Sequence, residues 1–213
     1  MDEIREWFHS VRIQETVKNL IRHGFDAIHV SDRRAACNEI LKRVPPSKTV
    51  GVGGSVTIRE TGILEKLKEQ GNTMFDHWEP GLGPEESLKV RKAHPSCDLF
   101  LTSTNAVTLA GEIVSADGFC NRISSAAFGP QEVIIVAGRN KIVRDIQAAL
   151  ARIKDVAAPM SARRFGLNPP CAQLGRCVDC DSPDRICRGT LILERRPFAT
   201  KVGVILVQED LGY

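Results

Sequence analysis

The stretch EVIIVAG, residues 132–138, is an unbroken run of β-branched and small apolar residues after its first glutamate. Such a run is typical of a strand in a parallel sheet, because helices cover both faces of these sheets and leave no polar side. The segment KIVRDIQAALARI, residues 141–153, follows it with apolar residues at helical spacing. A buried strand followed at once by a helix predicts one βα unit of a layered α/β fold.

The same alternation continues toward both ends of the chain. Further strands are expected at apolar or β-branched runs: AIHV (27–30), KTVGV (48–52), TMFDHW (73–78), CDLFLTS (97–103), TLILE (190–194) and VGVILV (202–207), the last of them central. Helices are expected in an opening segment that stops at Gly24, in 31–44 with Ser31 as its cap, and in 56–71, 84–94 and 141–153, with a hairpin at 105–118. This pattern predicts a doubly wound, mostly parallel sheet in one domain over residues 1–213.

Composition excludes several classes of function. The formal net charge is only +3, no block of like charges occurs, and aromatic residues make up 5% of the chain, so nucleic acid is not an expected partner. The charged start has no signal-peptide apolar run, and no stretch approaches the eighteen apolar residues of a membrane span. The expected compartment is a reducing cytoplasm, where disulfides among the cysteines are unlikely.

Glycines separate the expected strand 48–52 from the helix that follows it. Gly53, Gly54 and Ser55 form a loop that can act as a tight βα turn with Ser55 capping the helix. Alternatively, the loop holds a phosphate or carboxylate, because open α/β sheets bind ligands at the carboxyl ends of their strands. The spacing is neither G-x-G-x-x-G nor a P-loop, so it establishes no nucleotide cofactor.

Polar side chains follow two other expected strands at the same edge of the sheet. Taken singly, each is more typical of a turn or a structural hydrogen bond than of a site. Together they predict a cleft that binds a small anionic metabolite, with carboxylates able to act as base or nucleophile and with amides and cations able to hold the ligand. The candidate catalytic residues are Glu112 and Asp117, and the candidate ligand-binding residues besides the glycine loop are Asn105, Asn121, Arg122, Arg139 and Lys141. The five histidines are isolated in the sequence and were not expected to be ligands.

Five motifs resemble those of the lactate-utilisation, or LUD-domain, family: GVGGSVTIRETGIL, LTSTNAVTLAGEIVSADG, NRISSAAFGP, VIIVAGRNKIV and VILVQEDLGY. The resemblance implies a Rossmann-like three-layer α/β sandwich similar to the sugar-isomerase and CoA-transferase superfamily. It also implies a role in oxidising L-lactate to pyruvate beside iron–sulfur partner proteins. Cys120 stands where the family pattern DGxGNR usually has glycine. The family implies no catalytic residue, so the site residues above rest on position and chemistry alone.

Residues 159–188 interrupt the α/β alternation and are expected to form a loop-like excursion beside the ligand cleft. The segment is rich in Arg, Pro and Asp and carries cysteines in the spacing C-x5-C-x2-C-x6-C: Cys171, Cys177, Cys180 and Cys187. Four thiolates can hold an iron–sulfur cluster or a zinc ion, and nearby arginines favour the thiolate form of either site. The spacing favours an iron–sulfur cluster, with zinc, a redox-active thiol pair or an unmetallated loop as alternatives. Cys37 and Cys97 lie in apolar patterns and are expected in the core.

Three functions remain open at the level of sequence. The first is a component of a lactate-oxidising system that binds a small anion and a cluster. The second is a binding or regulatory module that senses a phosphorylated metabolite or a nucleotide without turnover. The third is a stand-alone enzyme on a CoA-transferase-like or sugar-phosphate-acting scaffold, in which Glu112 or Asp117 would react. The sequence does not decide among them, and it leaves a homo-oligomer open.

Overall fold

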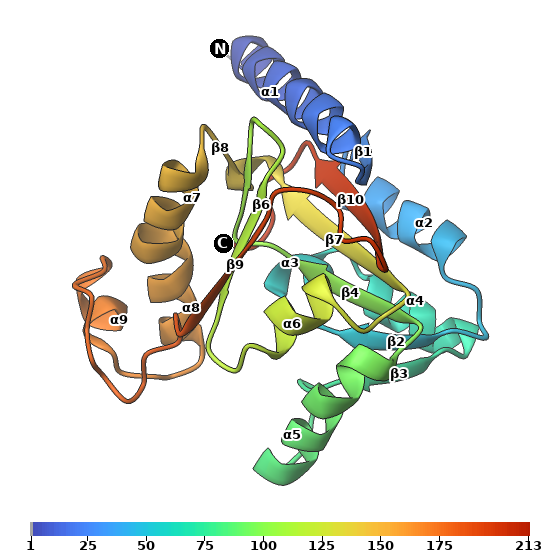
Figure 1. Ribbon diagram of the computed structural model, residues 1–213, viewed down its shortest axis with the longest axis vertical. Coiled ribbons are helices and arrows are strands. Elements are labelled where there is room, and N and C mark those ends of the chain that lie inside the picture. The colour runs from blue at the N-terminus through green and yellow to red at the C-terminus, as the bar shows by residue number, and fades with distance from the viewer. Residues whose placement is uncertain (1) are drawn as a thin grey trace.

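The computed structural model describes residues 2–213 and contains two sheets. The larger sheet is wholly parallel and has the strand order β1-β10-β7-β4-β2-β3, with bounds Asp26–Val30, Lys201–Val207, Glu132–Gly138, Leu99–Ser103, Thr49–Val52 and Thr73–Asp76. The expected central position of β10 is confirmed, because it pairs with β1 on one side and β7 on the other. This is the mostly parallel α/β architecture that the sequence predicts (Figure 1).

The smaller sheet is built from segments that lie between strands of the larger sheet in the sequence. Its order is β8-β5-β6-β9, with bounds Ile142–Val143, Ala106–Thr108, Ile113–Asp117 and Gly189–Leu193. β5 and β6 form the expected hairpin, whereas the expected late strand at 190–194 pairs antiparallel with β6 instead of joining the parallel sheet. The prediction of a single sheet was therefore wrong. A strand of two residues, such as β8, is too short to show a periodic pattern, so the sequence did not indicate a second sheet.

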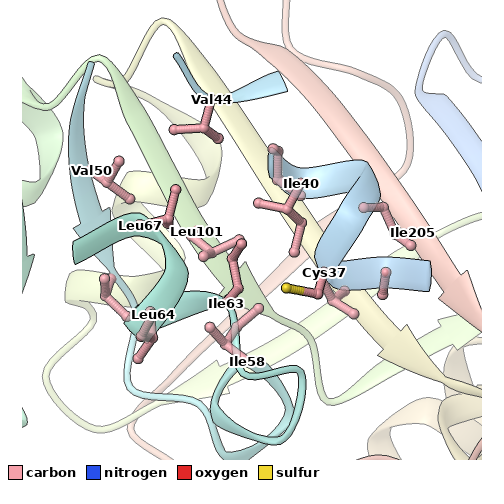
Figure 2. Packing of buried hydrophobic residues seen from close by; sticks show 14 of the residues in the cluster. Cys37, Ile40, Val44, Val50, Ile58, Ile63, Leu64, Leu67, Leu101 and Ile205 are labelled. Atoms are coloured by element: carbon pink, nitrogen blue, oxygen red, sulfur yellow. The ribbon is translucent and has the colours of Figure 1, made fainter. Parts of the chain in front are cut away.

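Helices and the smaller sheet cover the two faces of the parallel sheet. The helices are α1 (Asp2–Arg22), α2 (Arg33–Arg43), α3 (Val56–Glu60), α4 (Ile63–Gln70), α5 (Pro84–Ala93), α6 (Asn121–Ala127), α7 (Ile146–Arg152), α8 (Ala158–Arg164) and α9 (Pro170–Leu174). Residues of α2, α3 and α4 pack on one face of the sheet, as Figure 2 shows for Ile40, Ile58 and Leu67. On the other face, Ile13 and Leu20 of α1 join apolar residues of both sheets. Among residues 2–213, no helix is both long and apolar enough to cross a membrane.

Alternation within β7 explains the two cores. Ile134 and Val136 pack with the helix side, and Val133, Ile135 and Ala137 pack with the opposite side. Successive side chains of a strand point to opposite faces, so a continuous apolar run is required where both faces are covered. Each of these five residues is at most 1% exposed. The stretch EVIIVAG is thus a strand between two hydrophobic layers.

Several expected helices have other boundaries in the structure. The expected helix at 56–71 is two helices, α3 and α4, because Gly62 adopts φ +71° between them. The expected helix at 141–153 begins only at Ile146, where the Asp145 side chain accepts a hydrogen bond from Ala148 N at 2.8 Å. Asp32 rather than Ser31 caps α2, by accepting from Ala35 N at 2.8 Å. In each case, one capping residue or one residue with a left-handed backbone conformation places the helix boundary at a different position from the expected one.

The excursion at 159–188 is more regular than expected. Its first part is α8, which continues from α7 through the π-helical turn Ile153–Ala157, and α9 follows before the chain becomes irregular. Figure 1 shows α7, α8 and α9 together at one side of the molecule. The prediction of a loop was therefore wrong for residues 159–164 and 170–174, whereas residues 165–169 and 175–188 lack helix and strand.

Candidate functional site

The carboxyl ends of the parallel strands meet at one edge of the larger sheet. Gly53, Gly54 and Ser55 follow β2 at this edge. Asn105 follows β4, and Lys141 follows β7 at the end of the 3-10 turn Arg139–Lys141. Two adjoining cavities lie there and share Gly54, Asn105, Arg122, Ser161 and Arg164. The structure thus brings most of the expected ligand-binding residues together at the expected edge of the sheet.

The smaller cavity is polar and cationic. Its volume is about 60 Å³, and it is lined by Gly54, Ser55, Val56, Thr57, Ser103, Thr104, Asn105, Arg122, Lys141, Ser161, Arg164 and Tyr213. Three of these side chains are cationic and none is a carboxylate. The remaining polar groups are mostly hydroxyls, which can donate to an anion. This lining fits a carboxylate or a phosphate group and does not fit a cation.

Lys141 is the buried cation of the smaller cavity. The residue is 2% exposed, and its Nζ donates to Thr57 Oγ1 at 2.7 Å and to Ser103 Oγ at 3.0 Å. Burial, together with the neighbouring Arg152 and Arg122, lowers the pKa of Lys141 to about 7, while the charge of Glu60 acts in the opposite direction. No salt bridge joins Lys141 to a carboxylate among residues 2–213. Its ammonium form is therefore poorly compensated until an anion enters.

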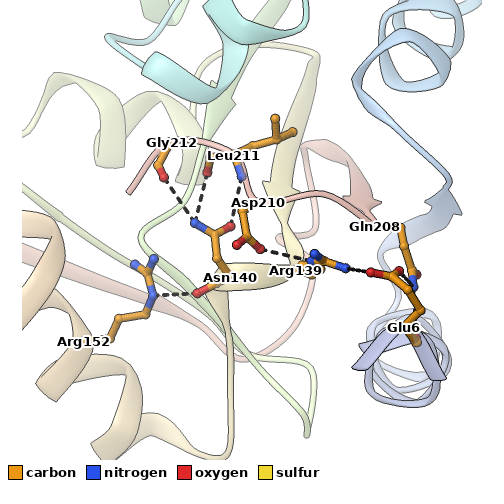
Figure 3. Close-up of polar contacts among 8 residues, drawn as sticks. All are labelled: Glu6, Arg139, Asn140, Arg152, Gln208, Asp210, Leu211 and Gly212. Carbon is orange, nitrogen blue, oxygen red and sulfur yellow. Dashed lines mark hydrogen bonds and ion pairs between the residues drawn. The ribbon is translucent and has the colours of Figure 1, made fainter. Parts of the chain in front are cut away.

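Two arginines beside Lys141 are held by neutral oxygens. Arg122 donates to Ser103 O at 3.1 Å, to Asn105 Oδ1 at 3.2 Å and to Ala116 O at 2.5 Å. Arg152 donates to Asn140 O at 3.0 Å, as Figure 3 shows, and to Asn105 O at 2.6 Å. Burial lowers the pKa of both guanidinium groups. Carbonyl oxygens fix the two guanidinium groups in place but leave their charge unneutralised.

The larger cavity is an open cleft of about 570 Å³ next to the small one. Five arginines and two aspartates line it: Arg91, Arg122, Arg164, Arg185, Arg188, Asp117 and Asp184. Its apolar wall includes Trp78 and Phe165, whose rings meet edge to face with centroids 5.8 Å apart, and the Arg164 guanidinium lies 4.1 Å from the Trp78 ring centroid. Arg91 Nε and His77 Nδ1 are buried without hydrogen-bond partners in the structure. Both belong to residues that line the cleft.

A buried histidine pair, which reaches this wall through His77, was missed in the sequence. The rings of His77 and His94 lie 5.4 Å apart. Burial lowers the pKa of His77 to about 3 and that of His94 to about 4, and the Arg91 charge lowers both. The pair is therefore neutral at ordinary pH. The two residues are seventeen positions apart in the chain, and no local pattern connects them.

The glycine loop owes its glycines to packing. A Cβ on Gly53 would lie 2.6 Å from Thr102 Oγ1, and one on Gly54 would lie 2.7 Å from the Trp78 ring. Ser55 caps α3 by accepting from Ile58 N at 3.2 Å, as the structural alternative predicts. The loop nevertheless lines the small cavity, and Gly54 lines both cavities. Substituting Gly54 would displace Trp78 first, so loss of binding in such a variant would not identify Gly54 as a ligand contact.

Asp117 and Asn105 line the cleft while holding its backbone. The Asp117 carboxylate accepts from Phe119 N at 3.1 Å and from Arg122 N at 2.8 Å, which closes the turn between β6 and α6. Asn105 Oδ1 accepts from Ala116 N at 2.8 Å as well as from Arg122. Asn121 lies on the cleft wall, with its Nδ2 3.5 Å from His94 Nδ1. These side chains position Arg122 and the turn that carries it.

Besides Gly53, two expected site residues, Glu112 and Arg139, lie outside both cavities. Glu112 hydrogen-bonds with Thr108 at the turn of the β5–β6 hairpin and lines neither cavity. Arg139 pairs with Glu6 of α1 at 2.5 Å and with Asp210 at 3.1 Å (Figure 3). Their sequence positions beside strand ends were correct, but their side chains point to other parts of the molecule. Neither is brought to the candidate site.

The cysteine-bearing segment forms a wall of the cleft, contrary to the expectation that it lies beside it. Arg185, Ile186, Cys187 and Arg188 line the cleft, and Arg188 N donates to Asp117 O at 3.3 Å. On the other side of this wall, a small cavity is lined by all four cysteines of the segment. Burial raises the pKa of the Cys171 thiol, and the other three thiols raise it further. The segment therefore connects the cysteine cavity to the ligand cleft.

Hydrogen bonds organise the loop around the close cysteine pair. Asp179 N donates to Cys177 Sγ at 3.3 Å, and Asp179 adopts φ +47°, which is uncommon for a residue other than glycine. Arg185 donates to Cys180 O at 2.7 Å and to Cys187 O at 3.2 Å. Among residues 2–213, no group of three or more His, Cys, Asp or Glu side chains stands in an arrangement that would hold one metal ion. Cys37 and Cys97 are buried in the core, as expected.

Comparison with known proteins finds a family model that matches this chain and a solved structure with a similar fold. The model of the LUD domain matches residues 13–207. A crystal structure of a DUF162 family protein from Deinococcus radiodurans is similar to this chain with a TM-score of 0.56 and 15% sequence identity. The similarity covers 93% of this chain and 98% of that one. No curated protein matches the sequence significantly.

Proposed function

Because the chain belongs to the LUD-domain family, we propose that it serves lactate utilisation by binding a small carboxylate in the cavity beside Lys141. The family is associated with lactate utilisation, which gives the coarse role. L-Lactate and pyruvate are small carboxylates, and their acid group matches the cationic lining of the small cavity. The proposal assigns Lys141, Arg122 and Arg164 to the carboxylate.

One observation carries this proposal: positive charges gather in the small cavity without a carboxylate to oppose them. Removing an unpaired charge from water costs several kcal/mol, and folded proteins rarely leave such a charge uncompensated. Lys141 is buried and has hydroxyl partners only, while Arg122 is bound to carbonyl and amide oxygens. A ligand carboxylate would supply the missing negative charge and would accept the available hydrogen bonds.

Calorimetric titration with L-lactate and with pyruvate tests the proposal. Arg164→Gln removes a charge from the lining of both cavities at an exposed residue, so the fold should persist. We expect this variant to bind either acid about tenfold more weakly, as loss of one charge-assisted hydrogen bond implies. Arg163→Gln is the matched control, because Arg163 is exposed and lines neither cavity. Equal affinities in the two variants, or no binding by the unaltered protein, would reject the proposed site.

The proposal places the protein in a system that oxidises L-lactate to pyruvate with iron–sulfur partner proteins in the cytoplasm. In this proposal, the chain binds the acid, and the partner proteins accept the electrons that its oxidation releases. Deletion of the encoding gene should abolish growth on L-lactate and spare growth on pyruvate. Normal growth on L-lactate would contradict the pathway while leaving the binding site untested, so the titration above remains the test of the site.

We propose in addition that Cys171, Cys177, Cys180 and Cys187 hold an iron–sulfur cluster, with zinc as the alternative. Four thiols around one cavity and an N–H donated to Cys177 Sγ support the proposal, because hydrogen bonds to sulfur stabilise metal-bound thiolates. As the loop stands, the thiols do not meet at a single point, so binding requires residues 175–188 to close around the metal. The turn at Asp179 and the bonds of Arg185 already orient that loop.

Anaerobic purification followed by metal analysis and a visible spectrum separates these possibilities. Iron and sulfide with an absorption that bleaches on reduction would support the cluster. Colourless protein with one equivalent of zinc would replace the cluster by zinc, and metal-free protein would reject both. Cys180→Ser should abolish metal binding, whereas Cys37→Ser should not, because Cys37 lies in the core among α2 and α4 residues (Figure 2).

A further inference from the structure

The placement of Lys141 permits chemistry beyond charge pairing, provided that the proposed carboxylate site is correct. Lys141 lines the small cavity, and Arg122 and Arg164 line the same cavity, which adjoins the larger cleft. The two arginines can hold a carboxylate while Lys141 faces the neighbouring carbon. In a 2-oxo acid that neighbouring carbon is a carbonyl, which amines attack.

We propose that Lys141 is a nucleophile that condenses with the carbonyl group of a bound 2-oxo acid to form an imine. The Nζ lone pair forms the new C–N bond, the C=O π bond breaks, the carbonyl oxygen takes up one proton, and the nitrogen gives one up. The resulting carbinolamine then loses its hydroxyl group as water while the C=N bond forms. One amine and one ketone give one imine and one water, and neither partner is oxidised or reduced.

Burial and neighbouring charge supply the neutral amine that this step requires. With a pKa of about 7, roughly half of the Lys141 side chains are neutral at pH 7, whereas an ordinary lysine with a pKa near 10.4 is neutral in only about one molecule in a few thousand. A desolvated lysine next to other cations is a recognised form of activated nucleophile. The charged or titratable groups around Lys141 are Arg122 of α6, Arg152 of α7, Arg164 of α8, Glu60 of α3 and Tyr213 of the C-terminal segment.

Tyr213 is available to transfer the protons of the condensation. Its hydroxyl is buried without a hydrogen-bond partner in the structure, and its side chain lines the small cavity. Burial raises the pKa of Tyr213, and the Arg164 charge beside it acts in the opposite direction. The phenol therefore keeps its proton at neutral pH and can donate it to the carbonyl oxygen.

The polypeptide after β10 holds Tyr213 over the cavity. Asn140 Oδ1 accepts from Leu211 N at 3.1 Å, and Asn140 Nδ2 donates to Gly212 O at 3.2 Å, as Figure 3 shows. Gly212 packs so closely that a Cβ there would lie 2.5 Å from Thr57 Oγ1 and 3.5 Å from Lys141 Nζ. The C-terminal segment therefore packs directly against Thr57 and Lys141.

Reductive trapping tests the inference on the full chain. Pyruvate and cyanoborohydride are added to the protein, and peptides are mapped by mass spectrometry. We expect the reduced adduct on Lys141, with labelling that increases as the pH rises from 6 to 9, because the amine loses its proton at a pH above its ligand-free pKa of about 7 once the acid is bound. Exposed Lys66 serves as the internal control, because it should remain almost unlabelled under the same conditions. L-Lactate, which has no carbonyl group, should bind and leave no adduct.

The outcomes separate this inference from the proposed binding site. Calorimetric binding of pyruvate without an adduct at Lys141 would overturn the imine and leave the carboxylate site standing. Absence of both binding and adduct would overturn both. Equal labelling of Lys141 and Lys66 would also reject the inference, because it would indicate no special reactivity. Lys141→Met should retain the fold, since it removes a buried charge, and should lose the adduct.

Discussion

Lys141 has a charge that depends on what occupies the cavity beside it. In the ligand-free protein, burial lowers the pKa of Lys141 to about 7 from its ordinary value of 10.5. A bound carboxylate favours the ammonium form and must therefore raise this pKa again. Binding of an anion is consequently coupled to proton uptake by Lys141 whenever the pH exceeds the ligand-free pKa.

This coupling predicts how the affinity for L-lactate changes with pH. Below about pH 7 Lys141 is already protonated, so the affinity should be nearly constant. As the pH rises above 7, binding requires one additional proton, and the association constant should fall by up to about tenfold per pH unit. Calorimetry at several pH values with buffers of different ionisation enthalpy measures both the affinity and the proton uptake. A constant affinity between pH 6 and pH 9 would contradict the role given to Lys141.

Cys120 occupies a backbone position that suits glycine. Its φ is +62°, in the left-handed region where a Cβ is crowded. We predict that Cys120→Gly is more stable than Cys120→Ala by about 1 kcal/mol, since both remove the thiol and only glycine relieves the strain. Urea unfolding of the two variants measures the difference. Equal stabilities would show that the strain is negligible.

At the scale of secondary-structure elements, the turn between β6 and α6 is the most consequential connection of the site. It begins with Asp117, and the helix that follows carries Arg122 into the cavity lining. The Asp117 carboxylate holds two backbone N–H groups of this turn. Because the Asp117 carboxylate is bound to these backbone groups, it affects the site by positioning Arg122. Its hydrogen bonds therefore indicate a structural role.

The corresponding prediction concerns Asp117→Asn. An amide retains one oxygen where the carboxylate offers two, so one of the two backbone donors loses its partner. We expect unfolding free energy to fall by about 1–2 kcal/mol and the affinity for L-lactate to fall with it, because Arg122 becomes less well positioned. Glu112→Gln is the matched control, since Glu112 lies outside both cavities. Unchanged stability together with complete loss of the reaction with pyruvate would instead indicate that Asp117 is a reacting group.

The elements also show what sequence patterns can predict in this chain. Long apolar runs such as EVIIVAG located the buried strands, and strand ends located Ser55, Asn105 and Lys141 at one edge. Glu112 and Arg139 were misplaced, because nearness to a strand end does not fix the direction of a side chain. Arg152, Arg164 and Tyr213 were missed, since they reach the site from α7, α8 and the C-terminal segment through tertiary packing. His77 and Trp78 likewise have no local signal.

At the scale of the whole molecule, the site is assembled from segments that are distant in sequence. Segments at the carboxyl ends of the parallel strands supply Lys141 and most of the hydroxyls, α6 and α8 supply arginines, and the C-terminal segment supplies Tyr213. Figure 1 shows α7 and α8 on the opposite side of the smaller sheet from β10 and α2. An anion that bridges these segments must stabilise the native state as a whole, because the unfolded chain has no such site.

Ligand binding should therefore raise the thermal stability of the protein. At 100 times its dissociation constant, L-lactate is expected to add about 2.7 kcal/mol to the unfolding free energy. For a chain of this length, that gain corresponds to a rise in Tm of roughly 5–11 °C. Lactamide is the matched neutral compound and should give no rise. An equal rise with lactamide would show that the carboxylate charge is not what the protein recognises.

The central claim is that the cavity beside Lys141 holds a carboxylate, and a crystal structure with bound L-lactate tests it most directly. The predicted result is electron density for the acid within the small cavity, with its carboxylate oxygens at hydrogen-bond distance from Lys141 Nζ and from Arg122 or Arg164. The contradicting result is a cavity without the acid in crystals soaked at a concentration that saturates binding in solution.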